Sequence, residues 1–238
     1  MVARAVQRIY RACAFLALCG TVFVSQRGFA GIIYNGGFEN DFSVTPNWSV
    51  SLADSGTLQR VTSWTALADA TKTIYPKEGA HFLLIKSDEY APTDTILRQS
   101  VALSAGEIVS GWMAIDAYLE SYQWADSDYA EVRILQNSTV LFLQTLTVDQ
   151  LKNDLSLLNW QSWSWTAPAT GTYTIELRAM DDTTKTGLMT WWGLFDGITV
   201  TESVVPEPSV GVALVSGLVM AMALGRLRHA RNRITTRG

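Results

Sequence analysis

Apolar and polar residues alternate with a period of two along several segments of this 238-residue chain. From Thr172 to Ala179 every second residue is apolar, and the pattern recurs over 130–134 and 97–103. Such alternation is typical of strands with one face in a core and the other in solvent. Further strands are expected at 31–35, 58–64, 80–86, 107–118, 139–148, 160–166 and 190–201. With one short helix expected at 149–158, the pattern predicts an all-β fold, an antiparallel two-sheet sandwich.

Residues 1–30 have the layout of a secretory signal peptide. Arginines at positions 4, 8 and 11 precede an apolar stretch over 12–24, and Gly28-Phe29-Ala30 offers small residues before a cut at Gly31. Both cysteines, Cys13 and Cys19, lie inside this segment. The predicted mature domain, residues 31–203, therefore has no thiol for a disulfide, a nucleophile or a metal ligand.

The middle segment is acidic. Residues 31–203 contain nine lysines and arginines against 21 aspartates and glutamates, and they hold all nine tryptophans of the chain. This charge disfavours nucleic acid and anionic membranes as partners. It suits divalent cations and neutral polymers.

The C-terminal segment 204–238 has three parts in a fixed order. The motif at 205–209 consists of Val205, Pro206, Glu207, Pro208 and Ser209, and an uncharged apolar run follows over 210–224. A basic tail over 225–238 includes Arg226 and Arg228. The run predicts a short transmembrane helix of roughly 22 Å, less than the ~30 Å hydrocarbon core of a bilayer. Arginines favour the cytoplasmic side, which leaves the preceding domain on the far side; a plain tail anchor is the alternative.

This three-part ending resembles the PEP-CTERM sorting signal of Gram-negative bacteria. The resemblance implies processing by an exosortase near the Pro-Glu-Pro motif. It further implies export across the inner membrane as a membrane-anchored precursor, followed by residence at the cell surface or in the extracellular matrix. The resemblance also implies that the bacterium that exports this protein makes exopolysaccharide.

Three short motifs in residues 31–203 resemble the jelly-roll carbohydrate-binding modules, also called galactose-binding-like domains. The motifs are Asn35-Gly36-Gly37-Phe38-Glu39, Glu78-Gly79-Ala80-His81-Phe82 and Phe195-Asp196-Gly197-Ile198. The resemblance implies that the first and last strands lie side by side with a structural Ca²⁺ between them. The implied ligands are the carbonyls of Gly37 and His81 and the carboxylates of Glu39, Glu78 and Asp196, a set of hard oxygens that suits calcium. Solvated loop charges and ordinary turns are the alternative.

Aromatic side chains are the candidates for sugar binding, because their flat faces stack on the C–H faces of pyranose rings. The first choice is a cluster in the expected loop 116–128, made of Tyr118, Tyr122 and Trp124. Trp163 and Trp165 share one strand face and are the second choice. Trp191 and Trp192 are adjacent and must face opposite sides of a strand. Packing in the core is the alternative for each tryptophan.

The sequence offers few groups of residues that could form a catalytic site. Glu131 and Glu176 could pair as acid and base, but their alternation with apolar residues favours a solvated strand face. His81 is the one histidine of the middle segment, and no Gly-x-Ser-x-Gly motif is present. The sequence therefore predicts an exported, non-enzymatic protein that binds extracellular polysaccharide. A structural matrix protein without glycan binding is the alternative, and a glycan hydrolase is a weaker one.

Overall fold

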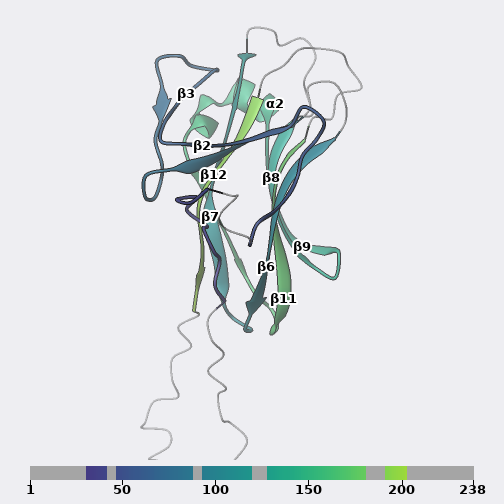
Figure 1. Cartoon of the computed structure of the whole chain (residues 1–238). Coiled ribbons are helices and arrows are strands. Elements are labelled where there is room, and N and C mark those ends of the chain that lie inside the picture. The colour runs from purple at the N-terminus through teal and green to yellow at the C-terminus, as the bar shows by residue number, and fades with distance from the viewer. Residues whose placement is uncertain (1–30, 42–46, 88–92, 120–127, 181–190, 203–238) are drawn as a thin grey trace, which may run out of the picture. The chain divides into compact units, whose positions relative to one another are not determined.

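A computed structural model describes residues 31–41, 47–87, 93–119, 128–180 and 191–202 (Figure 1). The chain divides into two compact units, Met1–Thr201 and Glu202–Gly238, and Glu202 is the single described residue of the second. The first unit contains two five-stranded antiparallel sheets. The first sheet has the order β1 (Ser49–Ser51), β6 (Asp94–Leu103), β11 (Gly171–Met180), β8 (Tyr129–Gln136) and β9 (Thr139–Thr147). The second sheet has the order β10 (Gln161–Thr166), β7 (Ile108–Ala117), β12 (Trp191–Thr201), β5 (Phe82–Lys86) and β2 (Thr57–Val61).

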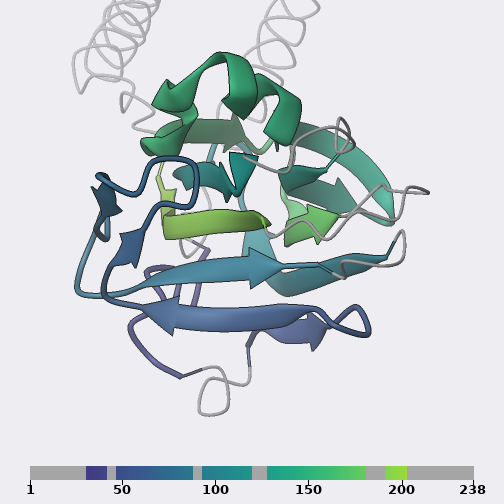
Figure 2. The same ribbon diagram turned by 90° about the horizontal axis from the view of Figure 1, so that it is seen from above.

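The two sheets pack face to face, which confirms the antiparallel two-sheet sandwich (Figures 1 and 2). Apart from the β8–β9 hairpin, strands from β5 onward alternate between the two sheets. This alternation is the arrangement of a jelly roll. The expected helix is present as α2 (Val148–Asn153) and the 3₁₀ helix η2 (Leu155–Leu158). Thr147 and Gln150 form a capping box that starts α2.

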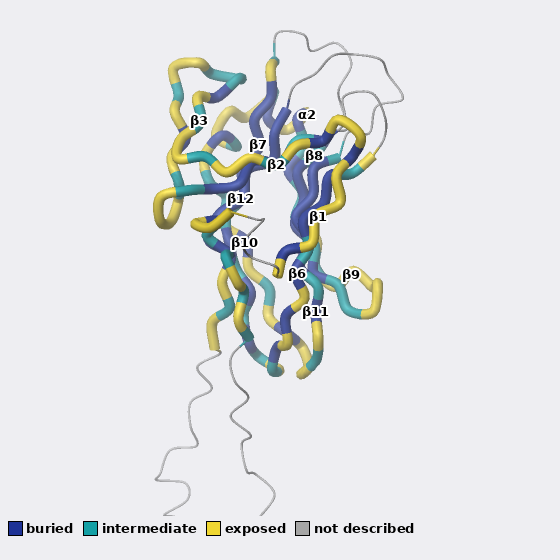
Figure 3. Tube along the Cα trace, viewed as in Figure 1, coloured by how far each residue is buried: buried dark blue, intermediate teal, exposed yellow. Residues whose placement is uncertain are grey.

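The first sheet follows the period-two pattern closely. Leu97, Leu177 and Val132 share one register row, and all three are fully buried against the second sheet. The hairpin β8–β9 turns at Asn137 and Ser138, whose φ angles of 49° and 67° match the left-handed turns that close tight hairpins. Figure 3 shows the buried stretches of both sheets concentrated where the two layers meet.

In the second sheet, β5, the C-terminal half of β7 and most of β12 are buried on both faces. These stretches read as continuous apolar runs, such as Phe82–Ile85, because a second layer covers their face turned away from the first sheet. That layer is the hairpin of β3 (Trp64–Thr65) and β4 (Thr73–Ile74) with the chain around it. The Trp64 ring lies 5.4 Å from the Trp192 ring, measured between centroids. Consequently both Trp191 and Trp192 are buried, one on each face of β12.

The N-terminal segment differs from its prediction. Residues 31–35 form no strand, since two of their amides bond to side chains instead of a neighbouring strand. Gly31 N donates to Glu107 Oε1 at 3.0 Å, and Tyr34 N donates to Gln99 Oε1 at 2.8 Å. The segment still reaches the last strand, because Ile198 N donates to Gly36 O at 3.0 Å.

The predicted signal peptide over 1–30 and the predicted sorting segment 204–238 lie outside the described residues. Among the residues that are described, no helix is long and apolar enough to cross a membrane.

Candidate functional site

Asp196 binds the turn that leads into β5. It is fully buried on β12, where its Oδ2 accepts hydrogen bonds from Lys77 N at 2.6 Å and Glu78 N at 3.0 Å. Its Oδ1 accepts from Gly197 N at 2.7 Å. Burial raises the pKa of Asp196 to about 6 against these hydrogen bonds, and the nearby Glu78 charge adds to the rise. One carboxylate thereby orders three backbone amides.

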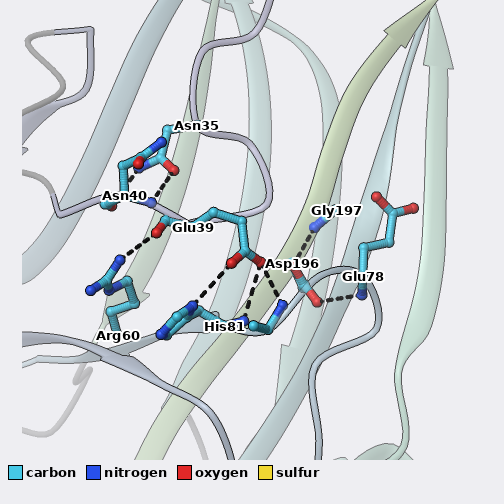
Figure 4. A network of polar contacts seen from close by, with 9 residues as sticks. Asn35, Glu39, Asn40, Arg60, Glu78, His81, Asp196 and Gly197 are labelled. Carbon is cyan, nitrogen blue, oxygen red and sulfur yellow. Dashed lines mark hydrogen bonds and ion pairs between the residues drawn. The ribbon is translucent and has the colours of Figure 1, made fainter.

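Glu39 binds the other end of the same turn (Figure 4). Its Oε1 accepts from Ala80 N at 2.8 Å and from His81 N at 3.2 Å, and its Oε2 lies 3.0 Å from His81 Nδ1. The His81 side chain is the largest cause that lowers the pKa of Glu39. Gly79 allows this approach, because a Cβ at that position would lie 2.0 Å from Glu39 Oε1. The turn also places Gly79 at a φ of 63°.

The predicted calcium ligands therefore lie near one another in a corner of the sandwich, formed by the N-terminal segment, the turn before β5 and the middle of β12. Their carboxylates do not converge. Glu39 and Asp196 direct their oxygens at backbone amides, and Figure 4 shows the Glu78 carboxylate turned away from Glu39 and His81. Gly37 lies on the neighbouring turn of the N-terminal segment. Within the described ranges, no group of three His, Cys, Asp or Glu side chains is arranged to hold a metal ion. The chemistry of the donor set fits a hard cation, whereas binding one would require Glu78 to turn inward.

The predicted strand aromatics lie in the core. Trp163 and Trp165 share one face of β10 as expected, and that face is the inner one. Trp163 is 4% exposed and packs against Phe142, while Trp165 packs edge-to-face on Tyr173 at 5.1 Å. Trp163 is therefore buried and Trp165 is partly buried against the core. In the expected loop, Tyr118 is 43% exposed, and Tyr122 and Trp124 lie outside the described residues.

A different tryptophan, Trp112, stands at the surface. It lies on β7, on the outer face of the second sheet, and is partly exposed. Beside it a shallow dent of about 230 Å³ is walled by three serines, Ser110, Ser162 and Ser164. Gly111 and Trp163 complete the lining. A flat ring next to several hydroxyls is the combination that sugar sites use.

Two features connect this dent to the corner. Lys77 Nζ lies 4.1 Å from the centroid of the Trp112 ring, within cation–π distance. A Cβ on Gly197 would lie 3.1 Å from Trp112 Cδ1 and equally close to the Glu78 carboxyl carbon. The corner thus positions the backbone of Lys77 and leaves room for the indole. Sequence reasoning missed Trp112, although its position one strand from Asp196 follows from the pairing of β7 with β12.

The two glutamates considered for catalysis are not solvated. Glu131 and Glu176 are 2% and 6% exposed on the outer face of the first sheet. Glu131 pairs with Arg133 and Glu176 pairs with Arg98, so the expectation of a solvated face was wrong. Arg98 lies opposite Glu176 on the neighbouring strand, whereas Arg133 lies two residues along β8 from Glu131, and both guanidinium groups neutralise these carboxylates.

No protein-family model matches the sequence. No curated protein matches it either. Among solved structures, the chain is similar to TmCBM61 in complex with beta-1,4-galactotriose, at 16% identity and a TM-score of 0.46 over 73% of this chain and 99% of that one. It is similar to the K3 cleaved adhesin domain of Lys-gingipain from Porphyromonas gingivalis w83, at 16% identity and 0.41 over 71% and 98%. It is also similar to the CBM22-1 xylan-binding domain of Paenibacillus barcinonensis Xyn10C, at 12% identity and 0.36 over 67% and 87%.

Proposed function

We propose that this protein is an exported, non-enzymatic polysaccharide-binding protein whose sugar site lies on the outer face of β7 and β10. The observation that carries the proposal is Trp112, a partly exposed indole beside a dent walled by Ser110, Ser162 and Ser164. The hydroxyls can donate to and accept from sugar hydroxyls, and the ring offers an apolar face. Lys77 adds a donor at the rim of the dent.

Retention on immobilised polysaccharides tests the proposal. The full chain, purified in mild detergent, should be retarded by at least one glycan, and Trp112→Ala should weaken the binding roughly tenfold or more, as loss of a central aromatic contact does. Tyr34→Ala, which removes an exposed ring elsewhere, is the matched control and should bind normally. Tyr118→Ala addresses the loop cluster predicted from the sequence.

A structural matrix protein without glycan binding is the second candidate. It is favoured if no polysaccharide on a broad panel retains the chain and Trp112→Ala changes nothing. Selective loss of binding in Tyr118→Ala would instead move the site to the loop cluster.

The proposal includes the predicted route of export. The signal peptide over 1–30 would direct secretion, and the segment 204–238 would hold the precursor in the membrane until an exosortase removes it. Intact mass of the protein recovered from producing cells tests this part. Loss of residues 1–30 and of the tail after the Pro-Glu-Pro motif is expected, whereas a full C-terminus would support a plain anchor.

The proposal also includes a structural Ca²⁺ at the corner, held by Glu39, Glu78 and Asp196 with the carbonyls of Gly37 and His81. What supports it is the gathering of these residues from three separate segments and the raised pKa of Asp196, which a nearby cation would relieve. The ion would brace the turn that carries Lys77 and would take no part in chemistry.

A further inference from the structure

The basic side chains of this acidic domain are distributed unevenly. On the first sheet, Arg98, Arg133 and Arg178 each form an ion pair with a carboxylate. Lys72 and Lys77 differ, since within the described part of the chain neither has a carboxylate oxygen within ion-pair distance. Lys72 Nζ donates to the neutral Asn159 Oδ1 at 2.7 Å, and Lys77 Nζ lies over Trp112. These two positive charges are therefore available to a ligand.

Both lysines line one pocket. It has a volume of about 310 Å³ and lies between β4, with the chain on either side of it, and the segment that connects η2 to β10. Tyr75, Asn159 and Trp160 line it as well. The Tyr75 side chain is 65% exposed, so its ring is free to meet a ligand. Asp69, a nearby acid, has its carboxylate engaged by the amide and hydroxyl of Thr71.

The backbone that carries the lysines is anchored at three points. Ala66 N donates to Lys72 O at 2.9 Å, Trp160 Nε1 donates to Tyr75 O at 2.9 Å, and Lys77 N donates to buried Asp196. The Trp160 ring in turn packs edge-to-face on Phe82, which is fully buried. The positions from which both ammonium groups extend are thus set before a ligand arrives, which reduces the entropy lost on binding.

We infer that this pocket binds the carboxylate of an acidic sugar residue, a uronate, within the polysaccharide chain. This inference rests on the proposed function and names its substrate class. The two ammonium groups would contact the carboxylate, and Tyr75 would contact the sugar ring. Lys77 both lines this pocket and reaches the Trp112 ring, so the pocket and the serine-walled dent form adjoining subsites. A sugar chain that spans them would present its acidic residue to the lysines and a neighbouring residue to Trp112.

The test compares acidic polymers with their own neutral forms. Polygalacturonate and alginate are used beside the same polymers after carboxyl reduction, with the full chain in mild detergent at low salt. The intact chain should bind at least one acidic polymer roughly three- to tenfold more tightly than its reduced form, as two exposed ion pairs allow. High salt should abolish the difference because it screens exposed charges.

Variants locate the effect. Lys72→Met should reduce the preference for the acidic polymer while binding to the reduced polymer persists. Lys152→Met removes the same charge elsewhere and should keep the preference. Equal affinity for acidic and reduced polymers, or an unchanged preference in the first variant, would overturn the inference and leave the proposed function standing. No retention on any of the four polymers would count against both.

Discussion

Asp196 shows how one buried carboxylate organises a surface. Its carboxylate accepts hydrogen bonds from the amides of Lys77, Glu78 and Gly197. The backbone position of Lys77, whose side chain reaches Trp112, therefore depends on the buried Asp196 carboxylate. The fold does not fully compensate its burial, since its pKa rises to about 6 from the ordinary value of 3.8. Ionised Asp196 is therefore less stable in the native protein than in the unfolded chain.

This imbalance gives a pH dependence with a definite sign. With EDTA present, the Asp196 contribution should raise the free energy of unfolding as pH falls from about 7 to 4, by on the order of 2–3 kcal/mol. Below the unfolded pKa both states are protonated and the gain is complete. Urea unfolding of the wild type and Asp196→Asn across this range measures it. The difference between the two proteins should vary with pH, and a constant difference would contradict the raised pKa.

Calcium should act on the same corner at neutral pH. If the ion binds, adding it should stabilise the protein by about 2.7 kcal/mol at 100 times its Kd, a rise in Tm of roughly 5–10 °C. Glu39→Ala and Asp196→Ala should abolish the response, and Asp54→Ala, an exposed acid elsewhere, should preserve it. A melting curve that is indifferent to both calcium and chelator would remove the ion from the account.

At the scale of elements, the period-two pattern predicted β11 to within one residue at each end, the centre of β8 and all but the first three residues of β6, because their outer faces are polar. The runs Phe82–Ile85 and Trp191–Ile198 were recognisable as strands, but the layer that covers them was not. That layer depends on β3 and β4, strands of two residues each, and on Trp64 and the 67–68 amides bonding to Asp116. Such contacts bridge about fifty positions of sequence and leave no periodic signal.

The candidate site was likewise predicted from the sequence only in part. The motifs around Glu39, Glu78 and Asp196 brought together residues that the structure also places in one corner. Trp112 and Lys77 were not foreseen, since a tryptophan inside an apolar run gives no indication of which face it takes. For Trp163 and Trp165 the sequence predicted a shared strand face but not which face it was, and the structure shows that it is the inner one.

Two adjacent glycines, Gly36 and Gly37, provide a test of the contact between the N-terminal segment and β12. A Cβ on Gly36 would lie 1.9 Å from Ile198 O, whereas the nearest atom to a Cβ on Gly37 is Glu39 Cγ at 4.0 Å. Gly36→Ala should therefore lower the free energy of unfolding by about 2–4 kcal/mol, and Gly37→Ala by less than about 0.5 kcal/mol. Chemical denaturation of both variants checks this. Equal losses would mean that the segment does not lie against Ile198.

At the scale of the whole molecule, basic and acidic residues are concentrated in different parts of the chain. The sequence puts nine arginines in residues 1–30 and 204–238, and an excess of acids between them. Within the sandwich, the arginines of the first sheet are paired with acids, while Lys72 and Lys77 line the pocket between β4 and the segment that connects η2 to β10. An acidic surface with one local basic pocket would exclude most polyanions and admit one that also fits the neighbouring subsite.

The central claim is that glycan binds beside Trp112, and the most direct test observes that side chain. In the ¹⁵N spectrum of the protein, Trp112→Phe identifies the indole N–H signal of Trp112. On titration with a retained oligosaccharide this signal should shift. The indole signal of Trp192, whose nitrogen is buried, should stay in place. Binding that shifts other signals and leaves Trp112 unmoved would contradict the account.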